Sequence, residues 1–205
     1  MPFRVGLIGL SQVPISQHGR ASRCYGTLTC PSSSVDRGLD HVEVLGSPVF
    51  GSVNNLILRT EPFRAVPANG SASTREKIAD RLQDSPVTFP AVLHPDSTMG
   101  RDVRLAEGVV VAAGVRLSAN IHVARHVHND QNAVIGNECT LCAFPRLNPQ
   151  ARVSGNVKVG RGASVGANAT VLHGRSMGDG AIVGTGAVVT GPVDAATIVR
   201  GVPAR

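Results

Sequence analysis

A six-residue periodicity runs from Leu93 to Val189 and constrains the fold more than any other feature of the sequence. Counting in sixes from Leu93 meets an aliphatic residue at sixteen of seventeen positions, with no insertion. The residue after each position is usually small, and the fourth residue after it is usually small or β-branched. Such a fixed short period indicates one small structural unit repeated many times. The aliphatic positions are Leu93, Met99, Leu105, Val111, Leu117, Val123, Ile135, Leu141, Leu147, Val153, Val159, Val165, Val171, Met177, Val183 and Val189.

Two inward apolar residues in every six suit a short, flat strand followed by a corner that a small residue can occupy. A helix would need apolar residues every three or four positions, and an ordinary β-sandwich would not keep a six-residue register for so long. Three strands and three corners close one triangular coil, three repeats in length, and successive coils stack at ~4.8 Å. We therefore predict a left-handed parallel β-helix over residues 93–190, in which residues eighteen apart lie above one another.

The residues before the repeat predict a small α/β, Rossmann-like domain over 1–86, followed by the β-helix domain over 87–205. Ser73 and Glu76 form a capping box, so we expect a helix over residues 74–83. The glycines near the N-terminus are not spaced as a phosphate-binding turn, so a nucleotide site there would be degenerate. Apolar runs predict strands at residues 3–10, 42–45, 55–59 and 63–66, the last ended by Pro67.

Composition narrows the function classes. The net charge is +6, but aromatic residues make up only 3% of the chain, so basic residues lack the stacking partners typical of nucleic-acid binding. We expect no nucleic-acid partner. The sequence contains no run of eighteen apolar residues and no segment resembling a signal peptide, so we expect no membrane span and a cytoplasmic location.

Three positions inside the repeat are chemically unusual. Cys139 falls on an inward position and Cys142 on a corner, so we interpret both as reduced structural cysteines and not as a metal or redox motif. Asn129 interrupts the aliphatic series, and an inward polar group must find hydrogen bonds. Two interpretations of Asn129 stay open: it is a structural asparagine, or its corner borders a functional cleft.

The C-terminal tail resembles that of hexapeptide acyltransferases, and three further segments narrow the resemblance. Together they are similar to the sialic-acid O-acetyltransferase and UDP-aminosugar N-acetyltransferase family (NeuD and PglD type). The similarity extends over residues 87–205, and before it only Asn69-Gly70, ahead of the predicted helix, resembles that family. The segments are Val134-Ile135-Gly136-Asn137-Glu138-Cys139, Leu147-Asn148-Pro149-Gln150-Ala151, Ser154-Gly155-Asn156-Val157, and a tail from Gly180 to Val189 closed by Gly201-Val202-Pro203-Ala204-Arg205.

The resemblance implies a homotrimer that binds acetyl-CoA in the cleft between neighbouring β-helices, with a sugar acceptor held by the N-terminal domain. The family's base, a histidine followed by an acidic residue, falls on Asn137 and Glu138. This is a departure, because an asparagine cannot accept a proton at neutral pH. A second family histidine, beside the thioester, falls on Arg146, which the resemblance assigns to CoA. Further CoA-contact positions fall on Gly155, Ala167 and Thr185.

The predicted coil geometry offers a substitute base. His128 lies one coil before Arg146 in the same column and is the nearest candidate. Some trimers with this repeat are zinc carbonic anhydrases, which need two close histidines and a third from a facing surface. His122, His126 and His128 crowd near one corner and lack that distant third ligand, so we expect no metal site.

The sequence leaves two functions open. The first is an acetyl-CoA-dependent acetyltransferase that acts on an amino or hydroxyl group of a nucleotide-linked sugar. The second is a catalytically impaired paralogue that binds CoA or serves as a structural partner. Asn137 and the missing glycine-rich turn favour the second function, whereas the intact repeat and tail suit both.

Overall fold

The computed structural model describes residues 5–8, 24–28, 43–44, 47–48, 53–58 and 60–205. The chain divides into two compact units, Met1–Pro90 and Ala91–Arg205. In the described part of the chain, no helix has both the length and the apolar character needed to cross a membrane.

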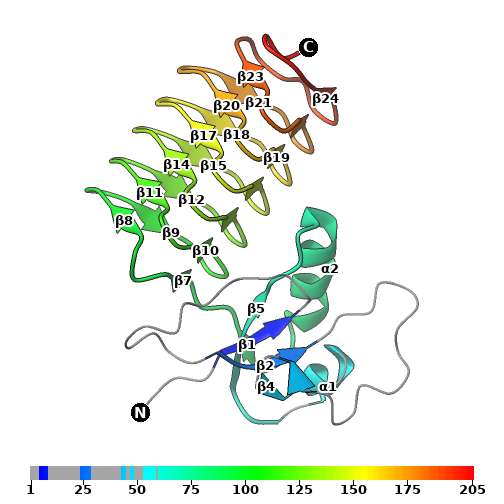
Figure 1. Ribbon diagram of the computed structural model, residues 1–205. Helices are drawn as coiled ribbons and strands as arrows, with labels where there is room; N and C mark the ends of the chain where they lie inside the picture. The colour runs from blue at the N-terminus through cyan, green and yellow to red at the C-terminus, as the bar shows by residue number, and fades with distance from the viewer. Residues whose placement is uncertain (1–4, 9–23, 29–42, 45–46, 49–52, 59) are drawn as a thin grey trace. The chain divides into compact units, whose positions relative to one another are not determined.

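The second unit is a parallel β-solenoid of triangular coils, which confirms the predicted β-helix (Figure 1). Its strands are only two residues long and stack into three parallel sheets. The first sheet contains β7 (Val92–Leu93), β10 (Val110–Val111), β13 (His128–Asn129), β16 (Arg146–Leu147), β19 (Ser164–Val165), β22 (Ile182–Val183) and β24 (Ile198–Val199). The second contains β8 (Thr98–Met99), β11 (Arg116–Leu117), β14 (Val134–Ile135), β17 (Arg152–Val153), β20 (Thr170–Val171) and β23 (Val188–Val189). The third contains β9 (Arg104–Leu105), β12 (His122–Val123), β15 (Thr140–Leu141), β18 (Lys158–Val159) and β21 (Ser176–Met177).

The strand register confirms the eighteen-residue coil. His128 pairs with Val110 on one side and with Arg146 on the other, and the same spacing holds in all three sheets. The last coil is shorter, because Ile182 pairs with Ile198. Residues eighteen apart in the sequence therefore lie directly above one another from the first coil to the start of the last one.

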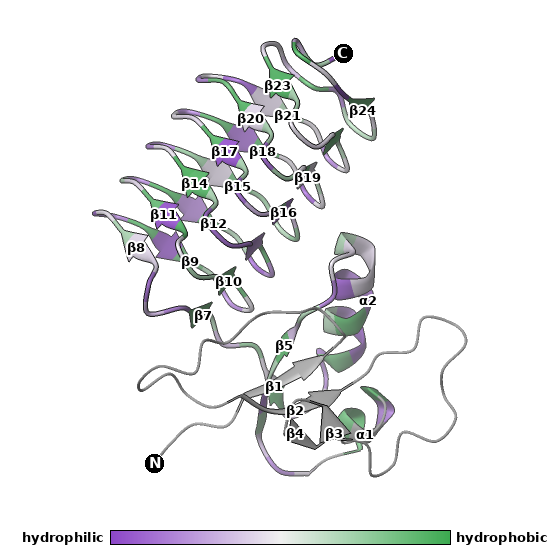
Figure 2. Cartoon of the chain, in the orientation of Figure 1, coloured by the Kyte–Doolittle hydropathy of each residue, from purple (hydrophilic) through white to green (hydrophobic). Residues whose placement is uncertain are grey.

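The aliphatic repeat positions fill the interior of the coils. Every one from Val111 to Val189 is buried, together with small inward residues such as Ala163. In Figure 2 hydrophobic and hydrophilic residues alternate along the coils, as inward and outward positions do. Leu93 and Met99 pair in register with the inward Val111 and Leu117, as predicted, but their side chains are exposed. They belong to the first coil, which has no preceding coil to pack against.

Asn129 is fully buried among these aliphatic residues. Its side-chain amide donates to the Val110 carbonyl at 3.2 Å, one coil earlier. Within the described residues the other polar atom of this side chain, Oδ1, has no hydrogen-bond partner. Asn129 thus lies in the core with one internal hydrogen bond, which favours the structural interpretation over a cleft-lining role.

The corners of the coil use left-handed backbone conformations. Each column of corners contains residues with positive φ, which asparagine, aspartate and glycine tolerate best. His126 and Phe144 occupy such positions in one column, and their rings stack with centroids 5.1 Å apart and an interplanar angle of 13°. The stacked rings are both buried, so packing offsets the unfavourable backbone at this corner.

The described residues of the first unit form a four-stranded parallel sheet in the order β2-β1-β5-β6, a short antiparallel pair of strands, β3 and β4, and two helices. Its elements are β1 (Val5–Ile8), β2 (Cys24–Leu28), β3 (Glu43–Val44), β4 (Ser47–Pro48), α1 (Val53–Ile57), β5 (Phe63–Pro67), α2 (Ala72–Leu82) and β6 (Val87–Thr88). Strands fall within the predicted ranges 3–10 and 42–45, whose remaining residues are partly outside the described ones. The strand predicted at 63–66 is confirmed, with Pro67 as its last residue.

Two predictions for this unit are wrong. Residues 53–57 form helix α1, where a strand was expected at 55–59, and the burial of both Val53 and Leu56 reflects helical spacing. Helix α2 begins at Ala72, earlier than predicted, and its N-cap is Ser71 and not Ser73. The Ser71 hydroxyl accepts a hydrogen bond from the Thr74 backbone N–H at 3.3 Å, so the cap forms two residues upstream of the predicted capping box.

Candidate active site

The corner between β14 and β15 carries Asn137 and Glu138, the two residues that the sequence resemblance aligns with a base and its acidic neighbour. Both side chains are exposed. Glu138 adopts a left-handed conformation with φ of 60°, and its backbone N–H donates to the Ala119 carbonyl of the preceding coil at 3.0 Å. The Asn137 carbonyl accepts from the Asn156 N–H of the following coil at 2.8 Å. The backbone therefore fixes this corner while leaving both side chains accessible.

Gly155 lies one coil above Asn137, and His173 lies one coil above Gly155. The His173 imidazole leans over Gly155, since a Cβ built on that glycine would meet His173 Nδ1 at 3.2 Å and the Asn137 carbonyl oxygen at 3.3 Å. His173 therefore shares a column with the predicted site. It was not among the predicted site residues, although the signal was present: His173 follows Asn137 by thirty-six residues, which is two coils.

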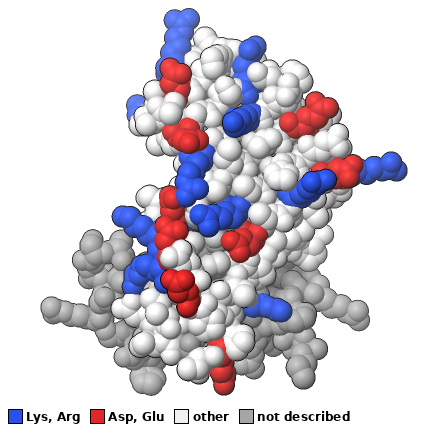
Figure 3. Space-filling model, turned by 180° about the vertical axis from the view of Figure 1, so that it is seen from behind, with Lys and Arg blue, Asp and Glu red and all other residues white. Residues whose placement is uncertain are grey.

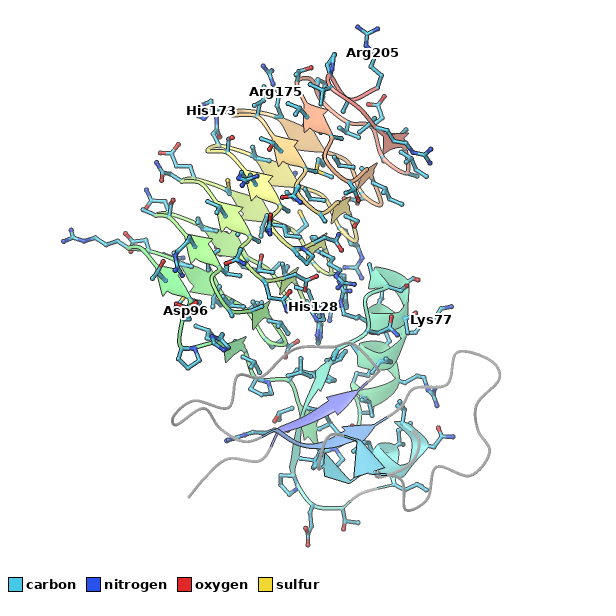
Figure 4. The ribbon with its side chains drawn as sticks, in the orientation of Figure 1. Lys77, Asp96, His128, His173, Arg175 and Arg205 are labelled. Atoms are coloured by element: carbon cyan, nitrogen blue, oxygen red, sulfur yellow. The ribbon has the colours of Figure 1, made fainter. Side chains whose placement is uncertain are left out.

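His128 is placed differently from the sequence-based expectation of a substitute base. It lies on β13 in the first sheet, paired in register with Arg146 as predicted, and is buried. The Asn137 corner joins the second and third sheets, so a single chain does not bring His128 to it. Figure 4 shows His128 and His173 on different edges of the β-helix.

Arg146, expected to contact CoA, is engaged by an internal carboxylate. Its Nε and Nη2 atoms both contact Asp130 Oδ2, at 2.8 and 2.7 Å, and both side chains are partly buried. Charge-assisted hydrogen bonds of this kind orient a guanidinium and leave its remaining N–H groups able to donate to a ligand. Arg146 is thus a positioned cation on the first sheet, with its charge partly balanced by Asp130.

The remaining CoA-contact positions divide between two edges. Gly155 belongs to the Asn137 corner, whereas Ala167 and Thr185 form one column at the corner between the first and second sheets. This second column is tightly packed, because a Cβ on the adjacent Gly166 would lie 2.6 Å from the Thr185 backbone nitrogen. The predicted site residues therefore lie at three places on one chain: the Asn137 corner, the corner with Ala167 and Thr185, and the first sheet, which carries His128 and Arg146.

Cys139 is next to the site but is not equipped as a nucleophile. Its side chain is buried, and its thiol donates to the Ser154 carbonyl at 3.0 Å. Burial raises the pKa of the Cys139 thiol above its ordinary value of 9.0, with the neighbouring Glu138 carboxylate acting in the same direction. The reactive thiolate is disfavoured, so nothing here supports an acyl-cysteine intermediate.

In the part of the chain that the structure describes, charges of both signs are mixed on the surface and side chains able to bind a metal ion are not clustered. Arginine and lysine side chains are interspersed with aspartate and glutamate on the face shown in Figure 3. Among the described residues, no group of three or more histidine, cysteine, aspartate or glutamate side chains is arranged to hold a metal ion. His122, His126 and His128 lie on a third-sheet strand, at a corner and on a first-sheet strand, respectively.

Comparison with known proteins finds solved structures that share the fold of this chain over nearly its whole length. No protein-family model matches the sequence, and no curated protein matches it. Similar solved structures include a histidine-to-asparagine variant of perosamine N-acetyltransferase from Caulobacter crescentus in complex with CoA and GDP-perosamine. It is 28% identical, with a TM-score of 0.85 over 98% of this chain and 95% of that one. The acetyltransferase domain of PglB from Neisseria gonorrhoeae is 24% identical, with a TM-score of 0.87 over 98% of both chains. WeeI from Acinetobacter baumannii is 24% identical, with a TM-score of 0.84 over 99% of both.

The repeat and the coil geometry give this chain the fold of these proteins, and the similar structures that are 28% identical to it are of an N-acetyltransferase. The resemblance to the NeuD and PglD type, first seen in the motifs of residues 87–205, is confirmed at the level of structure.

Proposed function

We propose that this protein transfers the acetyl group of acetyl-CoA to a nucleotide-linked sugar. The observation that carries the proposal is the match over 98% of the chain to an N-acetyltransferase crystallised with CoA and GDP-perosamine. An amino acceptor is favoured over a hydroxyl because that enzyme is an N-acetyltransferase. The parallel order β2-β1-β5-β6 supports a Rossmann-like first unit that holds the sugar nucleotide, and the hexapeptide repeat supports a left-handed helix.

The assembly we propose is a homotrimer with its sites between chains. Asn137, Glu138 and Gly155 lie at one corner of the coil, whereas Ala167 and Thr185 lie at another, with the second sheet between them. A single chain cannot bring the residues of both corners to the same thioester. Two chains can, if the Asn137 corner of one faces the Thr185 corner and Arg146 of the next.

Transfer would proceed by direct attack of the acceptor on the thioester. The buried, neutral thiol of Cys139 argues against a covalent intermediate. A backbone amide of the cleft, such as that of Gly155, would stabilise the developing oxyanion. Glu138 would supply a negative charge beside the reacting amine as it gains positive charge.

The alternative is a protein that binds CoA but has lost turnover, and Asn137 is the observation that favours it. The histidine-to-asparagine variant of the Caulobacter enzyme was crystallised with both CoA and GDP-perosamine. In that protein, therefore, such a replacement is compatible with binding of both ligands. Binding alone cannot distinguish the two functions, and turnover must be measured. The cytoplasmic location stays a prediction.

The test measures both acetyl transfer and the oligomeric state. Purified protein is mixed with acetyl-CoA and a panel of aminosugar nucleotides that includes GDP-perosamine, and release of the CoA thiol is followed with a thiol reagent. We expect acceptor-dependent thiol release and a mass, by light scattering, three times that of the 21.2 kDa chain. CoA binding by calorimetry without turnover on any acceptor would favour the alternative. A stable monomer would contradict the site between chains.

A further inference from the structure

The proposed acetyl transfer leaves one proton without a protein acceptor. An amine that attacks a thioester must lose a proton, and the residue in the family's base position, Asn137, cannot take it. The described part of the chain offers several histidines, but they differ in position and exposure. The base that completes the reaction should lie in the Asn137 column, have an exposed side chain, and lean toward the Asn137 corner.

His173 meets these three requirements. It stands two coils above Asn137 in the same corner column, and its side chain is exposed. Figure 4 shows it projecting from the edge of the β-helix. Its Nδ1 atom and the Asn137 carbonyl oxygen lie 3.2 and 3.3 Å, respectively, from the point where a Cβ of Gly155 would stand. The imidazole therefore leans over Gly155 toward the backbone of the Asn137 corner.

Gly155 is what permits this arrangement. Any side chain at position 155 would stand between the imidazole and the Asn137 corner and would push the ring away at a contact tighter than most real ones. In the last coil this corner is two residues shorter, because Val188 still pairs with Thr170 whereas Val193 bridges to Met177, so the eighteen-residue register is lost beyond His173. On the Asn137 side the imidazole is flanked by Gly155, a residue without a side chain.

We propose that His173 is the general base of this acetyltransferase, in place of the histidine that the family has at position 137. The inference rests on the proposed function. The amine lone pair of the acceptor forms a C–N bond with the thioester carbonyl carbon, and the amine proton passes to the His173 imidazole. When the tetrahedral intermediate collapses, the C–S bond breaks and the imidazolium returns the proton to the leaving thiolate. The products are the N-acetyl sugar and CoA thiol, with protons and electrons in balance.

This assignment competes with His128, and the structure separates the two. His128 is buried in the first sheet next to Arg146, away from the Asn137 corner of its own chain, and would have to act on a neighbouring chain's site. His173 acts at the corner of the chain to which it belongs. Substitution of each histidine therefore gives a clean comparison.

The experiment measures kcat, KM for acetyl-CoA and the pH dependence of kcat/KM for wild type, His173→Ala and His173→Gln. General-base catalysis contributes typically about 10²–10⁴-fold, so we expect kcat to fall by about that factor with little change in KM for acetyl-CoA. The acid limb that a histidine base produces between about pH 5 and 8 should disappear. Added imidazole should restore part of the rate of His173→Ala, which a merely structural role would not allow.

His122→Ala is the matched control, because His122 is also exposed but lies on β12 in the third sheet. It should keep the wild-type rate. Circular dichroism and light scattering on each variant verify that fold and assembly are intact. Because His173 is an exposed corner residue, we expect both of its variants to fold, and His173→Gln keeps a hydrogen-bonding side chain if the smaller residue does not.

Three outcomes would overturn the assignment. If His173→Ala keeps the wild-type kcat, His173 is not the base, although the acetyltransferase function stands. If only KM for acetyl-CoA rises, the residue contacts the cofactor and does not take the proton. If wild type itself transfers no acetyl group to any aminosugar nucleotide, the proposed function fails and this inference fails with it.

Discussion

Replacing Asn129 by leucine should stabilise the β-helix. Asn129 is fully buried, occupies a repeat position between Val111 and Leu147, and has a side-chain oxygen with no partner among the described residues. Leucine has the same branching and number of side-chain heavy atoms, so two methyl groups would take the places of Oδ1 and Nδ2. The substitution should therefore cause little overpacking.

The magnitude follows from three contributions. Removing an unsatisfied buried carbonyl gains about 1–3 kcal/mol, and the added apolar surface contributes further in the same direction. Losing the hydrogen bond from Asn129 to the Val110 carbonyl costs about 1 kcal/mol. We expect a net gain of about 1–2 kcal/mol in the free energy of unfolding. For a chain of this size, this corresponds to a rise in Tm of about 2–8 °C.

Thermal unfolding followed by circular dichroism, at matched protein concentration, measures this effect. The reverse change one coil later, Leu147→Asn, is the matched control and should destabilise the protein by about 3 kcal/mol, because it buries a new amide in an aliphatic layer. A lower Tm for Asn129→Leu, with the fold intact, would refute the reasoning. It would mean that Oδ1 has a partner, such as a buried water, that leucine cannot replace.

Three further predictions concern the core, a thiol and the base position. Val165→Asp places an unpaired charge in the narrow core and should lower the free energy of unfolding by about 4 kcal/mol or more, measured in urea, whereas Val165→Ile should be nearly neutral. Because burial raises the Cys139 pKa, the stability it contributes is full below the unfolded value of 9.0 and is lost as the pH rises from there through the raised folded value. The Tm of wild type should therefore fall more steeply above pH 9.0 than that of Cys139→Val, and parallel curves would contradict this. Asn137→His restores an imidazole beside Glu138 and should raise acetyl transfer by at least about tenfold in the His173→Ala background but add little in wild type, where His173 already takes the proton. An unchanged rate in the His173→Ala background would show that an imidazole at position 137 does not serve as the base.

The fold of the second unit could be predicted almost completely, because its pattern is local and repeats. Every coil applies the same rule, in which an aliphatic residue points inward and a corner follows, so an error at one coil does not spread to the next. The first unit has no such redundancy. Residues 53–57 form a helix in which Val53 and Leu56 are buried together, and the three-residue apolar run 56–58 does not distinguish a helix from a strand. The cap at Ser71 was missed because Ser73 offered an equally good local signal.

The site was predicted in part for a similar reason. Positions 137, 146 and 155 could be placed by the resemblance, but a substitute base was sought beside Arg146, because His128 is its neighbour in register. The column of His128 and Arg146 lies on the first sheet and not at the Asn137 corner, and sequence spacing alone does not relate the two. The ion pair between Arg146 and Asp130 could not be predicted from the sequence, since the two residues meet only through the rotamers of their side chains.

A β-helix gives an enzyme an unusual freedom to relocate a catalytic group along its axis. Residues at the same position of successive coils differ by a translation of ~4.8 Å with no change of orientation, so a side chain one coil away faces the same cleft. A histidine two coils away is normally screened by the side chain between. Here that residue is Gly155, and the His173 imidazole leans over it. The loss of histidine at position 137 and the lack of a side chain at position 155 are then linked, and Gly155→Val should impair acetyl transfer in wild type far more than in Asn137→His. If Gly155→Val lowers the rate of acetyl transfer equally in wild type and in Asn137→His, position 155 acts only through CoA. The structure would then no longer support His173 as the relocated base.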